Sequence, residues 1–179
     1  MDFVNTVHDR HADRREDYLV TPQRYRAWCI RAGLLTSAEG RKLASIGGGD
    51  TLMHDAENFR ESLYAVFCAR IDGTQAPKQA LHHLNKWVHR AWEELDVDCG
   101  GRLNWRSTSL DARLPLKRLA LSTLEVLQQG APERLKRCAT EVGCGWLFYD
   151  ETKNNRRQWC SMQTCGTVAK MKRYRARAA

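Results

Sequence analysis

The stretch Cys138–Cys165, CATEVGCGWLFYDETKNNRRQWCSMQTC, determines how the end of this chain folds. It holds four of the seven cysteines in a chain of 179 residues, spaced Cys-x5-Cys-x15-Cys-x4-Cys. Two closely spaced pairs joined by a longer arm are typical of a zinc site, because each pair forms a turn that directs two sulfurs at one ion. The spacing predicts one structural Zn²⁺ bound by Cys138, Cys144, Cys160 and Cys165.

Four thiolates leave no open coordination position, so the predicted ion is structural rather than catalytic. An iron–sulfur cluster and plain buried thiols are the alternatives that the spacing leaves open. The arm predicts two strands, WLFYD (146–150) and RRQWC (156–160), on either side of the turn ETKNN. The second cysteine pair is expected to lead into a helix, which gives the layout of a treble-clef-like finger. A module of this size has a small hydrophobic core, so a structural metal ion would stabilise it.

Basic residues are concentrated in the same part of the chain. From Pro132 onward there are eleven Lys and Arg against four Asp and Glu, whereas the rest has eighteen against seventeen. Local basicity indicates a polyanionic partner, although solubility alone is the alternative. A helix predicted over 168–178 would present these charges to phosphates. The candidate DNA-binding residues are Arg156, Arg157, Lys170, Lys172, Arg173, Arg175 and Arg177.

The preceding residues, 1–131, are predicted to form a mainly helical domain, with the finger over 132–179. Apolar residues recur at a 3.6-residue period, and Thr21-Pro22 and the capping box Thr36–Glu39 mark two helix starts. The predicted helices run from 21 to 33, from 36 to the glycines at 47–49, and over 51–71, 77–91 and 114–129. A β-hairpin is predicted around the turn at 98–101, and Cys29 and Cys68 fall in apolar helical patterns typical of a core.

Composition excludes other classes of protein. Hydrophobic residues make up 42 % and charged residues 28 %, which is typical of a globular protein. No apolar run is long enough to span a membrane, and the start of the chain becomes charged before a secretory signal could form. A cytoplasmic location with reduced thiols is therefore expected.

The finger residues GWLFYDETKNNRRQWCSMQTCG and AKMKRYRAR closely resemble the bacterial CGNR zinc fingers. The N-terminal DFVNT (2–6) resembles the opening of the ABATE domain that usually precedes such a finger. The resemblance implies a transcriptional regulator whose zinc ligands are the four cysteines named above. Two departures stand out: the namesake Cys-Gly-Asn-Arg reads Cys165-Gly166-Thr167-Val168 here, and the first cysteine gap is one residue longer than usual.

No catalytic constellation is predicted, and we expect no enzymatic activity. The phosphate-loop, dinucleotide-binding and nucleophile-elbow motifs are missing from the sequence. The pair His8 and His11 beside Asp9 and Asp13, and the helical His82 and His89, are more typical of solvated surfaces than of metal sites. In the N-terminal domain, Asp2 and Asn5 are the polar candidates, either as helix caps or as ligand-binding residues.

The leading hypothesis from the sequence is a DNA-binding regulator whose helical domain senses a small molecule or forms a homodimer. The alternative is a zinc-stapled module that binds a protein or a small molecule, with a basic tail that only aids solubility.

Overall fold

The computed structural model describes residues 1–10, 15–46, 49–106, 111–140 and 144–178. The chain forms two compact units. One, which we call the helical unit, comprises residues 19–66 and 76–129. The other, the finger unit, comprises residues 1–18, 67–75 and 130–179. No helix in the described part of the chain is long and apolar enough to cross a membrane.

The first helices of the helical unit begin where their caps predict. Helix α1 (Pro22–Arg31) starts after Thr21, whose hydroxyl accepts from the Arg24 backbone N–H at 3.2 Å. Helix α2 (Ser37–Ile46) starts with the predicted capping box, in which Thr36 and Glu39 bond to each other's backbone N–H groups at 2.7 and 3.2 Å. The Arg118 guanidinium also pairs with Glu39 and holds the pKa of that carboxyl at about 2.

The rest of the helical unit also follows the predicted order. Helix α3 (Gly49–Asp72) is followed by α4 (Lys78–Trp92), the antiparallel strands β3 (Leu95–Val97) and β4 (Leu103–Trp105), and α5 (Leu114–Gln129). The last turns of α3, from Phe67, belong to the finger unit. Ring contact between Phe59 and Trp87, with centroids 6.0 Å apart, joins α3 to α4 in the core. The predicted break at Gly47 and Gly48 lies outside the described residues.

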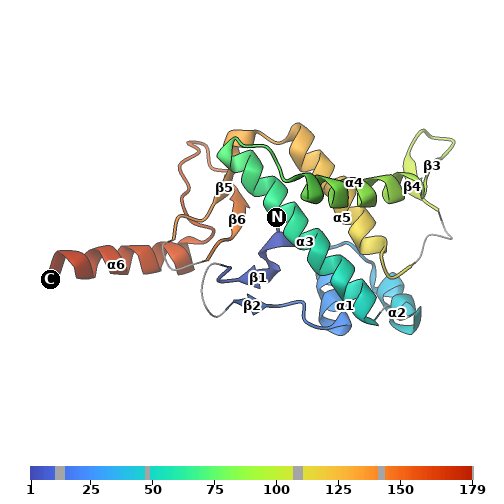
Figure 1. Ribbon diagram of the computed structural model, residues 1–179, viewed down its shortest axis with the longest axis horizontal. Helices are drawn as coiled ribbons and strands as arrows, with labels where there is room; N and C mark the ends of the chain where they lie inside the picture. The colour runs from blue at the N-terminus through green and yellow to red at the C-terminus, as the bar shows by residue number, and fades with distance from the viewer. Residues whose placement is uncertain (11–14, 47–48, 107–110, 141–143, 179) are drawn as a thin grey trace. The chain divides into compact units, whose positions relative to one another are not determined.

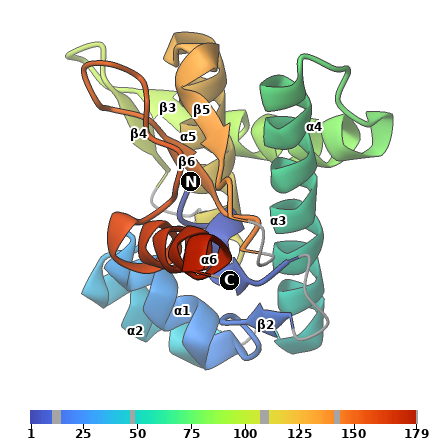
Figure 2. The ribbon, with the colours of Figure 1, turned by 90° about the vertical axis from the view of Figure 1, so that its left-hand side faces the viewer.

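The finger unit contains N-terminal structure that the sequence did not predict. Residues Val4–Thr6 form a 3-10 helix, and the short strands β1 (Val7–His8) and β2 (Glu16–Asp17) pair antiparallel. The finger strands β5 (Leu135–Arg137) and β6 (Leu147–Tyr149) form a second pair, side by side in both ribbon views (Figures 1 and 2). The apolar core of this unit draws on both parts, because the following side chains are all buried: Phe3, Val4, Val7, Leu135, Leu147 and Phe148.

The predicted hairpin of the finger was wrong in one of its strands. Strand β6 lies within WLFYD as predicted, but its partner is β5, which precedes the first cysteine. Residues 156–160 form no strand. The physical reason is that β5 and β6 directly flank the first cysteine pair, and burial of Leu135 and Leu147 favours their pairing. The arm from 150 onward is instead folded by polar contacts of the Asp150 side chain.

Helix α6 (Thr167–Ala178) confirms the predicted C-terminal helix and extends from the finger as one straight rod (Figure 1). A π-helical turn, Met162–Gly166, leads directly into it and contains Cys165. A metal ligand therefore lies immediately before the basic helix and fixes the position of its first turn.

Candidate metal centre and basic helix

The four predicted cysteine ligands converge on one point. Their sulfurs all lie within 4.8 Å of one another. The Cys160 sulfur is 3.6 Å from that of Cys144 and 3.6 Å from that of Cys165. A tetrahedral zinc with Zn–S bonds of about 2.3 Å requires sulfurs about 3.8 Å apart, so the donor set fits this ion. A disulfide would need about 2 Å, and all four cysteines are free.

Backbone hydrogen bonds position the four cysteine ligands as two pairs. Cys138 follows β5, and its backbone N–H donates to the Trp146 carbonyl at 2.8 Å, which extends the hairpin around the first pair. The Cys160 backbone N–H donates to the Cys138 sulfur at 3.4 Å and links the two pairs. Ser161 accepts from the Thr164 N–H at 3.4 Å and starts the turn that carries Cys165. The finger binds one structural zinc ion through these four sulfurs.

Burial and mutual contact keep the Cys144 and Cys160 thiols protonated in the absence of a metal ion. Contact with Cys138, together with burial, raises the pKa of the Cys144 thiol, and burial raises that of Cys160 to about 12. Crowded thiols cannot all ionise, because like charges at this separation repel one another. A bound divalent cation reverses this effect and stabilises the thiolates. Zinc affinity is therefore expected to fall as the pH falls and protons compete for the sulfurs.

Arg157, one of the predicted DNA-binding residues, braces the metal loop. Its guanidinium donates to the Trp159 carbonyl at 2.8 Å and also to the Cys160 carbonyl. It stacks over the Phe148 ring, 4.6 Å from the centroid. Arg156 next to it is exposed, and its side chain makes no hydrogen bond or ion pair with the described residues. Of these two neighbours, Arg156 is the one available to a phosphate.

We expect Arg157→Gln to weaken zinc retention about 10- to 100-fold, as loss of a residue supporting a metal ligand usually does. Competition with a chromophoric chelator measures this directly. Arg156→Gln removes the same charge one residue away and should leave zinc retention unchanged. Equal effects of the two substitutions would contradict the bracing role.

The buried Asp150 carboxylate organises the arm between the two cysteine pairs. It accepts from the Lys136 ammonium at 2.7 Å, the Arg157 N–H at 2.8 Å and the Thr152 hydroxyl at 2.6 Å. Burial alone would raise the pKa of Asp150, but these donors together lower it well below its usual range. The carboxylate therefore stays ionised and keeps the 150–157 turn closed beside β5.

Asn5, predicted as a cap or a ligand-binding residue, joins the N-terminal segment to the finger. Its amide nitrogen donates to the Leu147 carbonyl at 2.7 Å, and its amide oxygen accepts from the Leu147 N–H at 2.9 Å. The Trp146 indole donates to the Val7 carbonyl at 2.7 Å. The 3-10 helix has no side-chain cap, so the cap interpretation does not hold for Asn5. Asp2 is exposed at the surface of the same segment.

We expect Asn5→Ala to lower the free energy of unfolding of the finger unit by about 2 kcal/mol, because it leaves both backbone groups of Leu147 without partners. Urea denaturation followed by Trp fluorescence measures this change. Asp2→Ala, on the exposed neighbour, should change it by less than about 0.5 kcal/mol. If Asn5→Ala changes the free energy of unfolding as little as the control does, the two hydrogen bonds between Asn5 and Leu147 contribute little to stability.

The turn before α6 shows how the chain departs from Cys-Gly-Asn-Arg. A side chain at Gly166 would meet the Met162 sulfur at 3.1 Å, so glycine fits the tight contact there. The Thr167 hydroxyl donates to the Met162 carbonyl at 3.1 Å and braces the turn. Val168 is 45 % exposed at the start of α6. The side chain in the arginine position of the namesake motif is thus apolar and faces solvent.

Basic residues of the finger divide into two groups. One group forms hydrogen bonds or ion pairs that hold the finger together and includes Arg134, Lys136, Arg137 and Arg157. The second group is exposed to solvent on the arm and on α6: Lys153, Arg156, Lys170, Lys172, Arg173, Arg175 and Arg177. Arg173 also lies over the Trp159 ring, 5.6 Å from its centroid. A cavity of about 270 Å³ between that ring and the first turns of α6 is lined in part by Lys172 and Arg173.

Among the described residues, the four cysteines are the one group of His, Cys, Asp or Glu side chains that could hold a metal ion. His11 and Asp13 of the N-terminal histidine pair lie outside the described residues. His83 bonds to the Ser62 hydroxyl through its Nδ1, at 2.9 Å.

Two family models match the chain in succession. The ABATE model, described as "Putative stress-induced transcription regulator", matches residues 1–130. The CGNR zinc finger model matches residues 134–178, which include all four cysteines. No curated protein matches the chain. The first match covers well over half of the sequence, and the second agrees with the geometry of the metal centre.

Proposed function

This chain belongs to the ABATE family, and from that premise we propose that it is a transcription regulator that binds DNA through its zinc finger. In this proposal α6 and Arg156 contact the phosphates, and the helical unit responds to a small molecule. The metal holds the finger in shape and takes no part in a reaction, and no catalytic role is assigned to the chain. We also propose that the protein is cytoplasmic.

The observation that carries the proposal is the exposure of α6. Every residue from Lys170 to Arg177 is exposed, and five of these eight are basic. The chain has no acidic residue after Glu151. Like charges three or four residues apart destabilise an isolated helix, as with Arg173 and Arg177. A polyanion relieves this repulsion, so DNA would stabilise the helix that binds it.

One observation favours the alternative of a protein-binding module. Met171 and Tyr174 on α6 are 47 % and 69 % exposed, and Val168 lies near them along the helix. Large apolar side chains on an exposed helix are typical of a protein interface when they form a continuous patch. The three residues follow one another at intervals of three and so lie along one side of the helix. DNA remains the leading proposal because five of the eight residues from Lys170 to Arg177 are basic.

The test is a binding titration of the native protein on short duplexes at 50 mM salt. A double variant, Thr167→Asn with Val168→Arg, restores the namesake motif. We expect the native protein to bind with little preference among sequences, because phosphate contacts position a protein without specifying sequence. The double variant should bind more tightly. If neither protein binds DNA at this salt, the regulator proposal fails in favour of the protein-binding module.

A further inference from the structure

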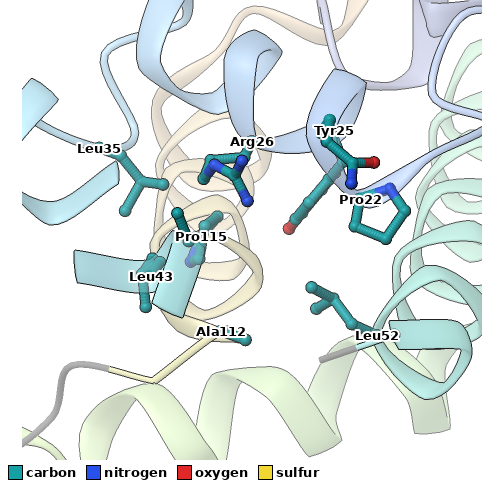
Figure 3. Close-up of a pocket in the computed structure, with 11 residues that line it drawn as sticks. Pro22, Tyr25, Arg26, Leu35, Leu43, Leu52, Ala112 and Pro115 are labelled. Atoms are coloured by element: carbon teal, nitrogen blue, oxygen red, sulfur yellow. The ribbon is translucent and has the colours of Figure 1, made fainter. Parts of the chain in front are cut away.

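The helical unit contains a largely apolar cavity of about 260 Å³. It lies between α1, α2 and the starts of α3 and α5, as Figure 3 shows. Leu35, Leu43 and Leu52 form much of its wall, and all three side chains are buried. The Arg118 contacts with Glu39 and with the Leu34 carbonyl hold α5 to α2 and to the loop before it, and so maintain the wall. Its volume is just below the usual range for ligand pockets, so it suits a small molecule.

Two polar side chains, Tyr25 and Arg26, line this apolar cavity. The Tyr25 hydroxyl is buried, with the residue 2 % exposed, and no nitrogen or oxygen atom of a described residue accepts or donates a hydrogen bond to it. The thiol of Cys29 lies near it, but a thiol is a weak donor and acceptor. Figure 3 shows the hydroxyl pointing into the cavity between Pro115 and Leu52. A buried hydroxyl without a partner is costly, which favours a ligand that accepts its hydrogen bond.

Arg26 provides a positive charge at the wall of the cavity. It is half-buried, lines the cavity beside Tyr25, and has no ion pair with a described residue. The nearby carboxylates are already neutralised: Asp55 pairs with Arg113 at 2.6 Å, and Asp111 pairs with Lys117. Burial, above all, raises the pKa of Tyr25 well above its usual value, so the phenol remains a donor. The cavity therefore combines apolar walls, one unpaired cation and one hydrogen-bond donor.

We propose that this cavity binds a small aromatic or short-chain carboxylic acid, whose carboxylate pairs with Arg26 while its hydrocarbon part fills the apolar space and Tyr25 donates a hydrogen bond. A planar guanidinium is well suited to a carboxylate. All residues that line the proposed binding site belong to the helical unit. Only its role as the site of an effector rests on the proposed function in transcription.

The test compares acids with their neutral amides on the native chain by isothermal titration calorimetry. Benzoate and hexanoate are the probes, and benzamide and hexanamide are their uncharged counterparts. We expect an acid to bind with a Kd at or below about 1 mM, and its amide to bind at least about tenfold more weakly. This comparison needs no variant, so it holds even if a substitution impairs folding.

Variants then assign the residues. Arg26→Gln should weaken benzoate binding at least about tenfold, whereas Arg24→Gln, an exposed arginine on the same helix, should leave it unchanged. Tyr25→Phe should weaken binding about fivefold without lowering the melting temperature of the ligand-free protein, because it removes a buried group that lacks a partner. If Tyr25 had only a structural role, Tyr25→Phe would lower the melting temperature and leave benzoate binding unchanged.

Two results would overturn the inference. One is that neither acid binds at 20 mM. The other is that an acid binds no more tightly than its amide and that Arg26→Gln leaves its binding unchanged. DNA binding by the finger is measured without any acid present. If the native protein binds DNA but no acid, this inference alone is refuted. If it binds an acid but no DNA, only the proposed function is refuted.

Discussion

Replacing Cys160 with serine is expected to release the metal and unfold the finger. Structural zinc contributes about 10–16 kcal/mol of apparent binding free energy in isolated fingers, most of it as folding free energy. The Cys160 sulfur lies 3.6 Å from those of both Cys144 and Cys165. Its loss removes one ligand and leaves three crowded thiols, so the native content of one zinc per chain should fall close to zero.

The consequence should extend to the N-terminal segment. Residues 1–18 belong to the finger unit and bond to Trp146 and Leu147, so their amides should lose protection from hydrogen exchange along with the finger. Residues 19–66 and 76–129 should keep theirs, because they form a separate unit.

The matched control is Cys99→Ser, since Cys99 is an exposed free thiol in the β3–β4 turn. This variant should keep both its zinc and its exchange protection. A folded, reduced native protein without zinc, as measured by atomic spectroscopy, would refute the prediction. So would a Cys160→Ser protein that retains one zinc per chain.

Binding to DNA should depend steeply on salt. Without Arg157, six of the predicted residues remain for phosphate contacts: Arg156, Lys170, Lys172, Arg173, Arg175 and Arg177. Each neutralised phosphate contributes about −0.9 to the slope of log K against log salt, so the native slope should be about −5. Replacing Lys172 and Arg175 together by glutamine should flatten it by about 2. The loss of affinity should be similar on all duplexes.

A second double variant separates local contact from total charge. Arg41→Gln with Lys42→Gln removes two exposed basic residues from α2 in the helical unit. If the finger makes the contacts, this variant keeps the native slope within about 0.5. Equal flattening by both double variants would show that net charge alone governs binding, and the assignment of α6 would then be withdrawn.

Local patterns in the sequence carried much of the fold. The capping box at Thr36–Glu39, the proline after Thr21 and the apolar periods correctly predicted the helices of the helical unit. They succeeded because a cap and a helical face involve residues only three or four apart. The four cysteines were also found by spacing, since each ligand pair is close in the chain and only one arm had to fold back.

Long-range contacts were predicted less well. The sequence indicated that WLFYD is a strand, but not that Leu135–Arg137 rather than 156–160 would pair with it. Both candidates lie close enough in the chain to pair, and strand propensity does not distinguish them. Burial of Leu135 and the use of Arg157 as a brace decided the pairing, and both depend on the folded arm.

What the sequence alone determined is the inventory: a helical region, a four-cysteine zinc site and a basic C-terminal helix. Each of these is a regular pattern over neighbouring residues, and such patterns constrain local structure directly. The tertiary structure decided the use of particular residues. It attached Asn5 to Leu147 over 142 positions and left the Tyr25 hydroxyl in a cavity, although Tyr25 fits an ordinary apolar helix face. The physical reason is that hydrogen-bond satisfaction depends on what lies opposite a side chain after folding, and spacing along the chain does not encode it.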